Sequence, residues 1–182
     1  LHEVELGVQY ALIITSNAGL WCYDIGDTIK FVSMEPYRLV VTGRIKHFTS
    51  AFGEHVIAEE VEGAVQDAMA SAGGVVTEFH VAPEVSPANG LPFHEWFIEF
   101  SELPPDVEAF AKAVNEGVLK RNPYYRDLIS GAILQNAKVR LLQKGAFHQA
   151  MANRGKLGGQ NKPPRLANGR DFAAELERLT QH

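Results

Sequence analysis

The hydrophobic period of this chain changes near residue 57, and that change constrains the fold strongly. Before it, short runs rich in Val, Ile, Thr and Tyr alternate with turn-forming residues, which is typical of strands. After it, apolar residues recur three and four positions apart, as one face of an amphipathic helix requires. These residues are Ile57, Val61, Ala64, Val65, Ala68 and Met69. A β-rich start followed by a region of helices and strands is therefore expected.

The remaining patterns predict strands and helices in mixed order. Gly73 and Gly74 end the first helix, and Pro104-Pro105-Asp106 starts a second one. The predicted strands are 8–15, 19–23, 28–33, 38–42, 75–81, 93–100 and 138–142, and the later helices are 106–121, 125–134, 145–152 and 172–179. We therefore predict an α+β fold, with a small mixed sheet backed by helices and a few additional N-terminal strands.

Composition excludes several classes of function. Lys and Arg number 17 against 22 Asp and Glu, so the formal net charge is −5 and a nucleic acid is not expected as a partner. No apolar run approaches the roughly 20 residues of a membrane span. The single cysteine, Cys22, cannot form an internal disulfide and lies in an apolar run, which predicts a small core residue. We expect a soluble, cytoplasmic protein with no membrane partner.

Two glycine-containing motifs precede the change of period. Residues 23–27 read Tyr-Asp-Ile-Gly-Asp, and residues 43–54 read Gly-Arg-Ile-Lys-His-Phe-Thr-Ser-Ala-Phe-Gly-Glu. A carboxylate placed like Asp27, after a strand and a Gly, can accept hydrogen bonds from two adjacent hydroxyls, as a ribose offers. Taken alone, the spacing of Gly26-Asp27 favours a tight turn over a ribose contact.

The order and spacing of these motifs resemble the domain junction of adenylate-forming enzymes. The stretch GRIKHFTSAFGEHVIAEEVE is similar to one branch of them, the auxin-responsive-promoter family of acyl-acid amido synthetases. The resemblance covers nearly the whole chain but only the last third of such an enzyme. It implies a ligase that activates a carboxylic acid with ATP and Mg²⁺ and passes the acyl group to an amino acid. Because the ATP and acyl pockets lie in the larger N-terminal domain, this chain alone is expected to be inactive and to hold no cofactor.

The resemblance also implies a division of the chain. Residues 1–42 would be terminal strands of the large ATP- and acyl-binding domain, 43–56 the hinge and the loop after it, and 57–182 a mobile C-terminal lid domain. The partners would then be the lid's own N-terminal domain, a carboxylic acid and an amino acid. Leu1 stands where a gene product begins with Met, and a predicted strand follows almost at once, so we expect a piece of a longer chain.

Three groups of residues receive roles from the resemblance. Asp27 would bind the ATP ribose, and Arg44 and Lys46 would form the hinge, with the backbone of Lys46 changing as the lid rotates. Taken alone, Gly-Arg-x-Lys fits an ordinary surface turn with solvated cations, but its register with Asp27 upstream and Gly53 downstream favours the hinge. The candidates for a loop near the acyl and acceptor tunnel are Thr49, Ser50, Gly53 and Glu54. Small hydroxyl residues before a helix favour an anion nest, although plain helix capping uses the same residues.

Lys162 is the candidate catalytic residue. It follows a Gly-rich stretch and precedes Pro163-Pro164-Arg165, which resembles the late Gly-Lys motif of adenylating enzymes. A fixed cation there would relieve the repulsion between the carboxylate and the α-phosphate. Asn161 stands where that motif has Gly, so Lys156 remains an alternative, and an exposed loop lysine is the plain explanation.

The seven histidines do not predict a metal site. His80 and His94 lie in neighbouring predicted strands, but no His-x-His pair and no partner cysteine accompanies them. Two other functions stay open. One is a non-catalytic α+β module that binds a nucleotide or a partner protein, and the other is the lid domain of an enzyme resembling acyl-CoA ligases.

Overall fold

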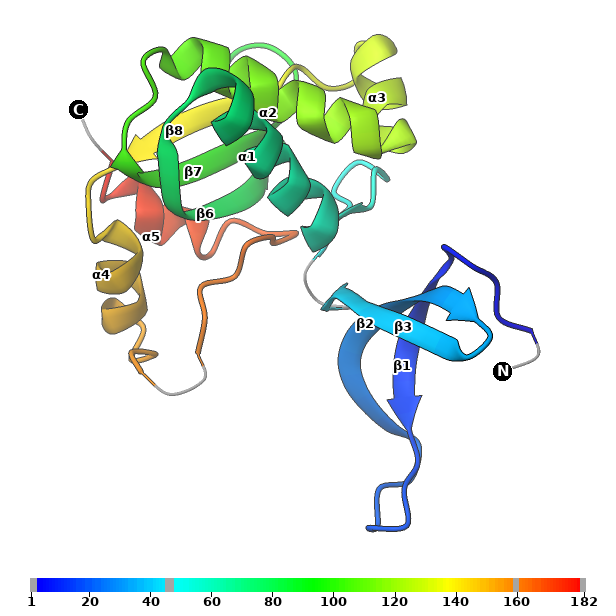
Figure 1. Ribbon diagram of the computed structural model, residues 1–182. Helices are drawn as coiled ribbons and strands as arrows, with labels where there is room; N and C mark the ends of the chain where they lie inside the picture. Colours follow the sequence, from blue (N-terminus) through cyan, green and yellow to red (C-terminus); the bar gives the residue numbers. More distant parts are fainter. Residues whose placement is uncertain (1–2, 45–47, 159–160, 181–182) are drawn as a thin grey trace. The chain divides into compact units, whose positions relative to one another are not determined.

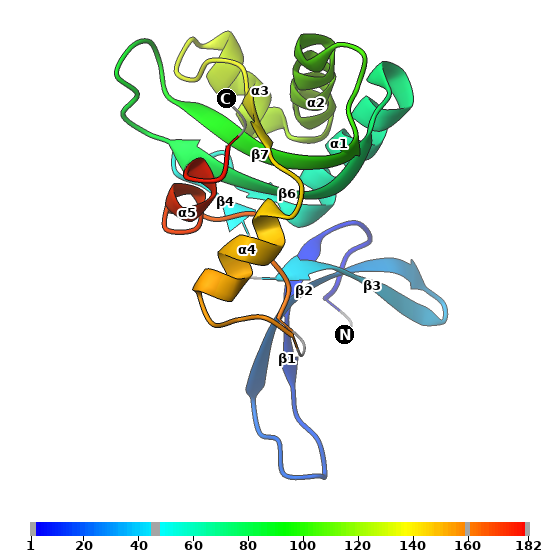
Figure 2. The same ribbon diagram turned by 90° about the vertical axis from the view of Figure 1, so that its left-hand side faces the viewer.

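The computed structural model describes residues 3–44, 48–158 and 161–180. The chain divides into two compact units, Leu1–Phe48 and Thr49–His182. Figure 1 and Figure 2 show the strands of the first unit in blue and the second unit in the remaining colours. Each unit is described by itself below.

The first unit is an antiparallel sheet of β1 (Gln9–Ile14), β2 (Tyr23–Met34) and β3 (Tyr37–Arg44), with β2 in the centre. Phe31 of β2 is buried, and the rings of Tyr10 and Tyr37 pack edge-on against it with ring centres 6.0 Å away in each case. Ile29 is the other buried apolar residue among the described residues of this unit. Its core is therefore very small.

The predicted strand 19–23 and the predicted burial of Cys22 are both wrong. The backbone N–H of Ser16 donates to the carbonyl of Leu20 at 2.9 Å, which closes a turn in place of a strand. Cys22 follows that turn in the left-handed backbone region, with φ 47°, and is exposed. The Leu20 carbonyl is occupied by this turn and is not available to pair with a neighbouring strand.

The second unit contains a mixed sheet in the order β6-β7-β8. β6 (Val75–Glu84) and β7 (Phe93–Glu102) are antiparallel, whereas β8 (Lys138–Leu142) runs parallel to β7. Figure 2 shows α1, α2 and α3 on one face of this sheet and α4 and α5 on the other. The helices are α1 (Ala58–Ala72), α2 (Val107–Arg121), α3 (Pro123–Ser130), α4 (Ala146–Asn153) and α5 (Ala173–Glu177). The predicted α+β fold with a small mixed sheet backed by helices is confirmed.

Both faces of β7 are buried. Trp96, Ile98 and Phe100 pack into the core beneath α1, α2 and α3. Phe97 points to the opposite face and joins the core formed with α4 and α5. Successive side chains of a strand point to opposite faces, so a central strand covered on both sides reads as a near-continuous apolar run.

Local signals explain where the helices start and end. Gly73, with φ 78°, ends α1, as predicted. The carboxylate of Asp106 accepts the backbone N–H groups of Glu108 and Ala109 and caps α2. Asn122 follows the last residue of α2 and caps α3 by accepting the Tyr125 N–H at 2.7 Å. Because of this shared residue, α3 begins two residues before the predicted start.

The two long helices pack closely at one point. A Cβ atom on Gly117 of α2 would lie 2.7 Å from the Cα atom of Ala64 of α1, which is closer than real side chains come. Glycine is therefore required there for the helices to meet. Within the described part of the chain, no helix combines the length and apolar character needed to cross a bilayer.

Candidate functional site

Asp27, the predicted ribose ligand, lies in β2 directly opposite Arg44 in the strand pairing with β3. Gly26 before it has a left-handed backbone, with φ 76°, and donates its N–H to Asp24 Oδ1 at 2.8 Å. Asp27 is half-buried. The structure thus places one predicted nucleotide contact and one predicted hinge residue side by side. Lys46, the other predicted hinge residue, lies outside the described residues.

The loop after the predicted hinge joins β4 (Phe48–Thr49) to β5 (Val56–Ile57), and its start is tied to the C-terminal part of the chain. The buried Thr49 hydroxyl donates to the carbonyl of Ala167 at 3.0 Å. The Ser50 N–H donates to Asn168 Oδ1 at 2.7 Å. Neither contact caps α1, so the capping interpretation of these two residues is wrong. Both residues instead fasten the loop to a segment 118 residues away.

Glu54 is fully buried in the second unit. Its Oε1 lies 2.8 Å from His94 Nε2, and its Oε2 accepts the Phe52 N–H at 2.8 Å. Burial alone would raise the pKa of Glu54, but its hydrogen bond to His94, the charge of His94 and the backbone N–H groups together hold the pKa below its usual value. The His94 ring in turn stacks on Tyr125, with ring centres 5.0 Å apart. The Glu54 side chain therefore anchors the loop to the core, while Gly53 makes the turn beside it with φ 89°.

Lys162 is exposed, and the segment after it is fixed to the edge of β6. The Val81 N–H donates to the carbonyl of Arg165 at 2.9 Å, and the Ala167 N–H donates back to the carbonyl of Val81 at 3.1 Å. These two bonds make a short parallel bridge between Leu166 and β6. His80 Nδ1 lies 2.6 Å from the carbonyl oxygen of Pro164. Lys162 therefore lies just ahead of a firmly attached stretch.

Arg165 strengthens this attachment. Its guanidinium lies 2.6 Å from Glu62 of α1 and 3.3 Å from Glu78 of β6, and it covers the ring of Phe79 at 5.2 Å. A cavity of about 140 Å³ adjoins Arg165 between α1 and β6. Ligand pockets usually measure about 300–1,000 Å³, so we do not assign a nucleotide to this cavity. Lys156, the alternative to Lys162, is also exposed and follows Gly155 after α4.

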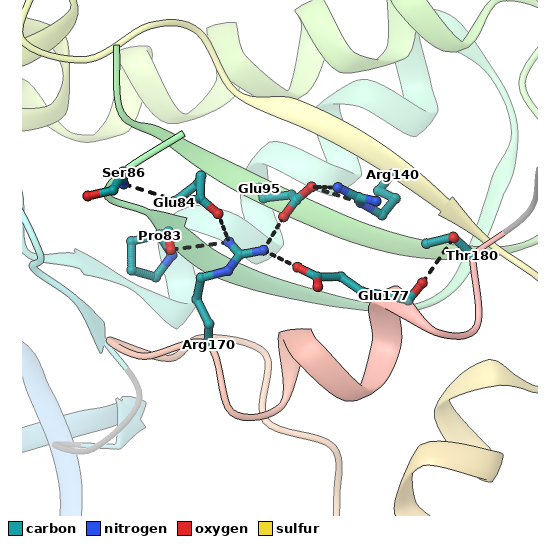
Figure 3. A network of polar contacts seen from close by, with 8 residues as sticks. All are labelled: Pro83, Glu84, Ser86, Glu95, Arg140, Arg170, Glu177 and Thr180. Carbon is teal, nitrogen blue, oxygen red and sulfur yellow. Dashed lines mark hydrogen bonds and ion pairs between the residues drawn. The ribbon is translucent and has the colours of Figure 1, made fainter. Parts of the chain in front are cut away.

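Further along, Arg170 fixes the segment that leads into α5, as Figure 3 shows. Its guanidinium lies 3.2 Å from Glu84, 2.6 Å from Glu95, and in contact with Glu177. Glu95 is buried and also accepts Arg140 Nε at 2.8 Å. A buried carboxylate must be paired, and here two arginines serve that need.

Sequence reasoning missed His80, Arg165, Arg170 and the pairing of Glu54 with His94. One signal was present: polar residues stand inside strands that are otherwise apolar, as in Phe-His-Glu-Trp-Phe-Ile-Glu-Phe at 93–100. Such residues are expected to be buried with partners. The partners lie 40 to 84 residues away for Glu54–His94 and His80–Pro164, so no local spacing identifies them. In the described part of the chain, His, Cys, Asp and Glu form no group of three suited to a metal ion.

Known protein families and relatives match the sequence of this chain. Residues 59–171 match the sequence profile of the GH3 family C-terminal domain. Residues 1–44 match the profile of the GH3 family central domain. The indole-3-acetic acid-amido synthetases GH3.3 and GH3.4 of Arabidopsis thaliana are each 26% identical to the chain. Each match covers 92% of this chain and 30% of the relative.

Solved structures share the fold. A GH3.15 acyl acid amido synthetase matches with a TM-score of 0.78 at 18% identity, over 99% of this chain and 34% of that one. A 2-hydroxyisobutyryl-CoA ligase in the postadenylation state matches with a TM-score of 0.55 at 16% identity, over 96% of this chain and 35% of that one. The chain thus spans about a third of the length of the proteins it matches. Since the C-terminal domain of one family covers well over half of it, the chain belongs to the GH3 family.

Proposed function

We propose that this chain is the C-terminal part of an ATP-dependent acyl-acid amido synthetase, which adenylates a carboxylic acid and joins it to an amino acid. Family membership supports the reaction class, and the named relatives are amido synthetases. One structural observation carries the proposal furthest. The loop after the hinge and the segment that bears Lys162 are joined through Thr49, Ser50, Ala167 and Asn168. The two elements proposed to serve the reaction therefore belong to one body.

We propose a separate role for each of three consecutive segments of the chain. Residues 1–42 belong to the large domain, residues 43–56 are the hinge and its loop, and residues 57–182 are the mobile lid. Arg44 and Lys46 form the hinge, and the loop of Thr49, Ser50, Gly53 and Glu54 approaches the acceptor side of the active site. For this loop, the burial of Thr49 and Glu54 supports contact through the backbone rather than through those two side chains.

Lys162 is the proposed catalytic residue. Attack of a carboxylate on the α-phosphate brings two anions together, and a cation held between them lowers that repulsion as charge moves to the departing pyrophosphate. The exposure of Lys162 leaves its ammonium able to reach a substrate, while Pro163 and Pro164 stiffen the chain behind it. Asp27 holds the ribose through its carboxylate, which accepts hydrogen bonds from both hydroxyls.

The co-substrate of the full-length enzyme is ATP with Mg²⁺, and its partners are a carboxylic acid, an amino acid and the N-terminal domain. One carboxylate contact to a ribose is worth about 1.5–3 kcal/mol, whereas a micromolar dissociation constant needs about 8 kcal/mol. Asp27 alone is therefore too weak to hold ATP on this chain. We also propose a cytoplasmic location, because the one cysteine precludes an internal disulfide.

The test uses the full-length protein and separates the two half-reactions. Lys162→Ala should slow acyl-adenylate formation, measured by ATP–pyrophosphate exchange, by about 10²–10³-fold. Amide formation from a supplied acyl-adenylate should stay within about 2-fold, because the cation is needed only while pyrophosphate departs. Lys112→Ala is the matched control, since Lys112 is exposed on α2 and pairs only weakly with Glu116 at 3.9 Å.

Other results would redirect the assignment. Loss in Lys156→Ala with no loss in Lys162→Ala would move the role to Lys156. Equal loss of both half-reactions in Lys162→Ala would mean a structural role. A thiol acceptor is the second candidate, favoured by the fold shared with the 2-hydroxyisobutyryl-CoA ligase. Acyl transfer to coenzyme A, with none to any amino acid, would support that candidate.

A further inference from the structure

We propose that His80 is a positioning residue for adenylation, because its ring holds the chain immediately behind Lys162 on the edge of β6. The inference rests on the role proposed above for Lys162. His80 lies in the middle of β6 and is completely buried. Its Nδ1 lies 2.6 Å from the carbonyl oxygen of Pro164, two residues after Lys162.

The two prolines explain why a side chain is used at this point. Pro163 and Pro164 have no backbone N–H, so this stretch cannot donate to the edge of β6 as a regular strand would. The backbone ladder starts only at Arg165, whose carbonyl accepts the Val81 N–H at 2.9 Å. His80 extends the attachment one residue closer to Lys162. Without it, the tether between the ladder and Lys162 would be longer and freer.

The chemistry of the contact fixes the tautomer of the ring. A carbonyl oxygen can only accept, so Nδ1 carries the proton and donates it to Pro164. The other nitrogen, Nε2, is buried and finds no hydrogen-bond partner within the part of the chain that the structure describes. Leaving such a group unsatisfied lowers the stability of the fold. An apolar residue would avoid that cost but would leave the Pro164 carbonyl without this donor.

The ring is also held rigidly. Phe172 packs against it edge to face, with ring centres 5.0 Å apart and an interplanar angle of 86°. Phe97 lies on β7 at 6.3 Å from the same ring. Arg165 meanwhile binds Glu62 and Glu78 on the far side of the attachment. A donor fixed in this way defines where Pro164 lies, and two residues span at most about 7 Å, so it also limits where Lys162 can reach.

Positioning at this accuracy has a kinetic consequence. A displacement of about 1 Å at a reacting group can cost about 10²-fold in rate. Losing the His80 bond should therefore slow the step that uses Lys162 and leave the other step unchanged. That selectivity separates positioning from a general loss of stability.

The experiment compares three substitutions in the full-length protein. His80→Leu keeps the volume but removes the donor, and should slow acyl-adenylate formation in single-turnover measurements by about 10–100-fold. His80→Asn places an amide N–H near the position of Nδ1 and should recover the rate to within about 3-fold of the parent. His80→Gln carries the same amide one bond further out and should not recover it. His148→Leu, at an exposed histidine of α4, is the matched control.

Amide formation from a supplied acyl-adenylate should stay within about 2-fold in every variant, which shows that each one is folded. If His80→Leu does not fold, the contrast between Asn and Gln still decides the question. In a Lys162→Ala background, His80→Leu should add less than about 2-fold, because it acts through Lys162.

Three outcomes would overturn the inference: Asn and Gln being equally impaired, both half-reactions slowing together, or the full His80→Leu effect persisting without Lys162. The last of these would leave the proposed function intact if Lys162→Ala alone slows adenylation. If Lys162→Ala has no effect, the role of Lys162 fails first, and the positioning role of His80 fails with it.

Discussion

The two units of this chain have strands of similar composition, but the strands are covered by other elements to very different degrees. In the second unit, helices cover both faces of β6–β7–β8, and Trp96, Phe97 and Phe110 have no exposed surface. In the first unit, Ile13 of β1 is 60% exposed and Val41 of β3 is 62% exposed. The intrinsic strand propensity is therefore similar in both units, and the stability of each sheet depends on how much of its apolar surface is buried. A small sheet with so little buried area is marginal by itself, and exposed apolar surface of this kind typically marks an interaction site.

The largest expected effect tests this contrast with one phenylalanine from each unit. Phe110→Ala should lower the free energy of unfolding of the second unit by about 3–5 kcal/mol, because it empties a fully buried site that packs edge-on against Phe100. Phe31→Ala should leave that transition within about 0.5 kcal/mol. Urea unfolding followed by the fluorescence of Trp96, in a Trp21→Phe background, makes the measurement.

A shift of the Trp96 transition by Phe31→Ala as large as that caused by Phe110→Ala would break the comparison. It would mean that the two units unfold in one cooperative transition, so that loss of stability in the first unit lowers the free energy of unfolding of the second by the same amount.

The next effect is a pH dependence that belongs to the second unit. Burial, together with the charges of Arg170 and Arg154, lowers the pKa of His80 to about 4, and the Pro164 hydrogen bond only partly opposes this. Between pH 6.5 and 4 the unfolded histidine binds a proton that the folded one does not. The free energy of unfolding is therefore unaffected by His80 protonation above pH 6.5, where the histidine is neutral in both states. It falls as the pH drops from 6.5 toward 4, because protonation then favours the unfolded chain. The unfolding free energy should drop by about 2–3 kcal/mol from pH 7 to pH 4.5.

His80→Asn provides the control, since an amide does not titrate in this range. Urea midpoints of the parent and the variant should converge on acidification, and parallel curves would contradict the assigned burial of His80.

The smallest expected effect concerns the ion cluster drawn in Figure 3. Arg170→Lys should lower the stability of the second unit by about 1–2 kcal/mol, because one ammonium cannot reach Glu84, Glu95 and Glu177 together with the Pro83 carbonyl. Arg178→Lys should change stability by less than about 0.5 kcal/mol, because Arg178 is exposed and pairs with the half-buried Glu175 at 3.4 Å. Thermal unfolding of both variants side by side gives the comparison, and equal shifts would show that Arg170 is solvated like Arg178.

The sequence predicted the framework of the second unit well and its polar contacts poorly. The period of α1, the Pro-Pro-Asp start of α2 and the aromatic-rich run of β7 depend on neighbouring residues, so spacing alone located them to within a few positions. The strand proposed at 19–23 failed because backbone bonds at Ser16 and Leu20 close a turn there. The pairs Glu54–His94 and His80–Pro164 depend on how distant strands and loops come together, which a local pattern does not encode. Asp27 and Lys162 as functional residues stay predictions.

The bonds from Thr49 and Ser50 to residues 167 and 168 have a consequence for the order in which the chain is made. During synthesis, the loop at 49–55 leaves the ribosome before the sheet and the first three helices of the second unit. The loop nevertheless has no partner for Thr49 or Ser50 until more than a hundred further residues have emerged. The anchoring of this loop within the second unit is therefore completed only after the α1–α2 core has emerged. A chain cut short before residue 167 would keep most of that core, yet the start of the loop at 49–55 would lack its two distant anchors.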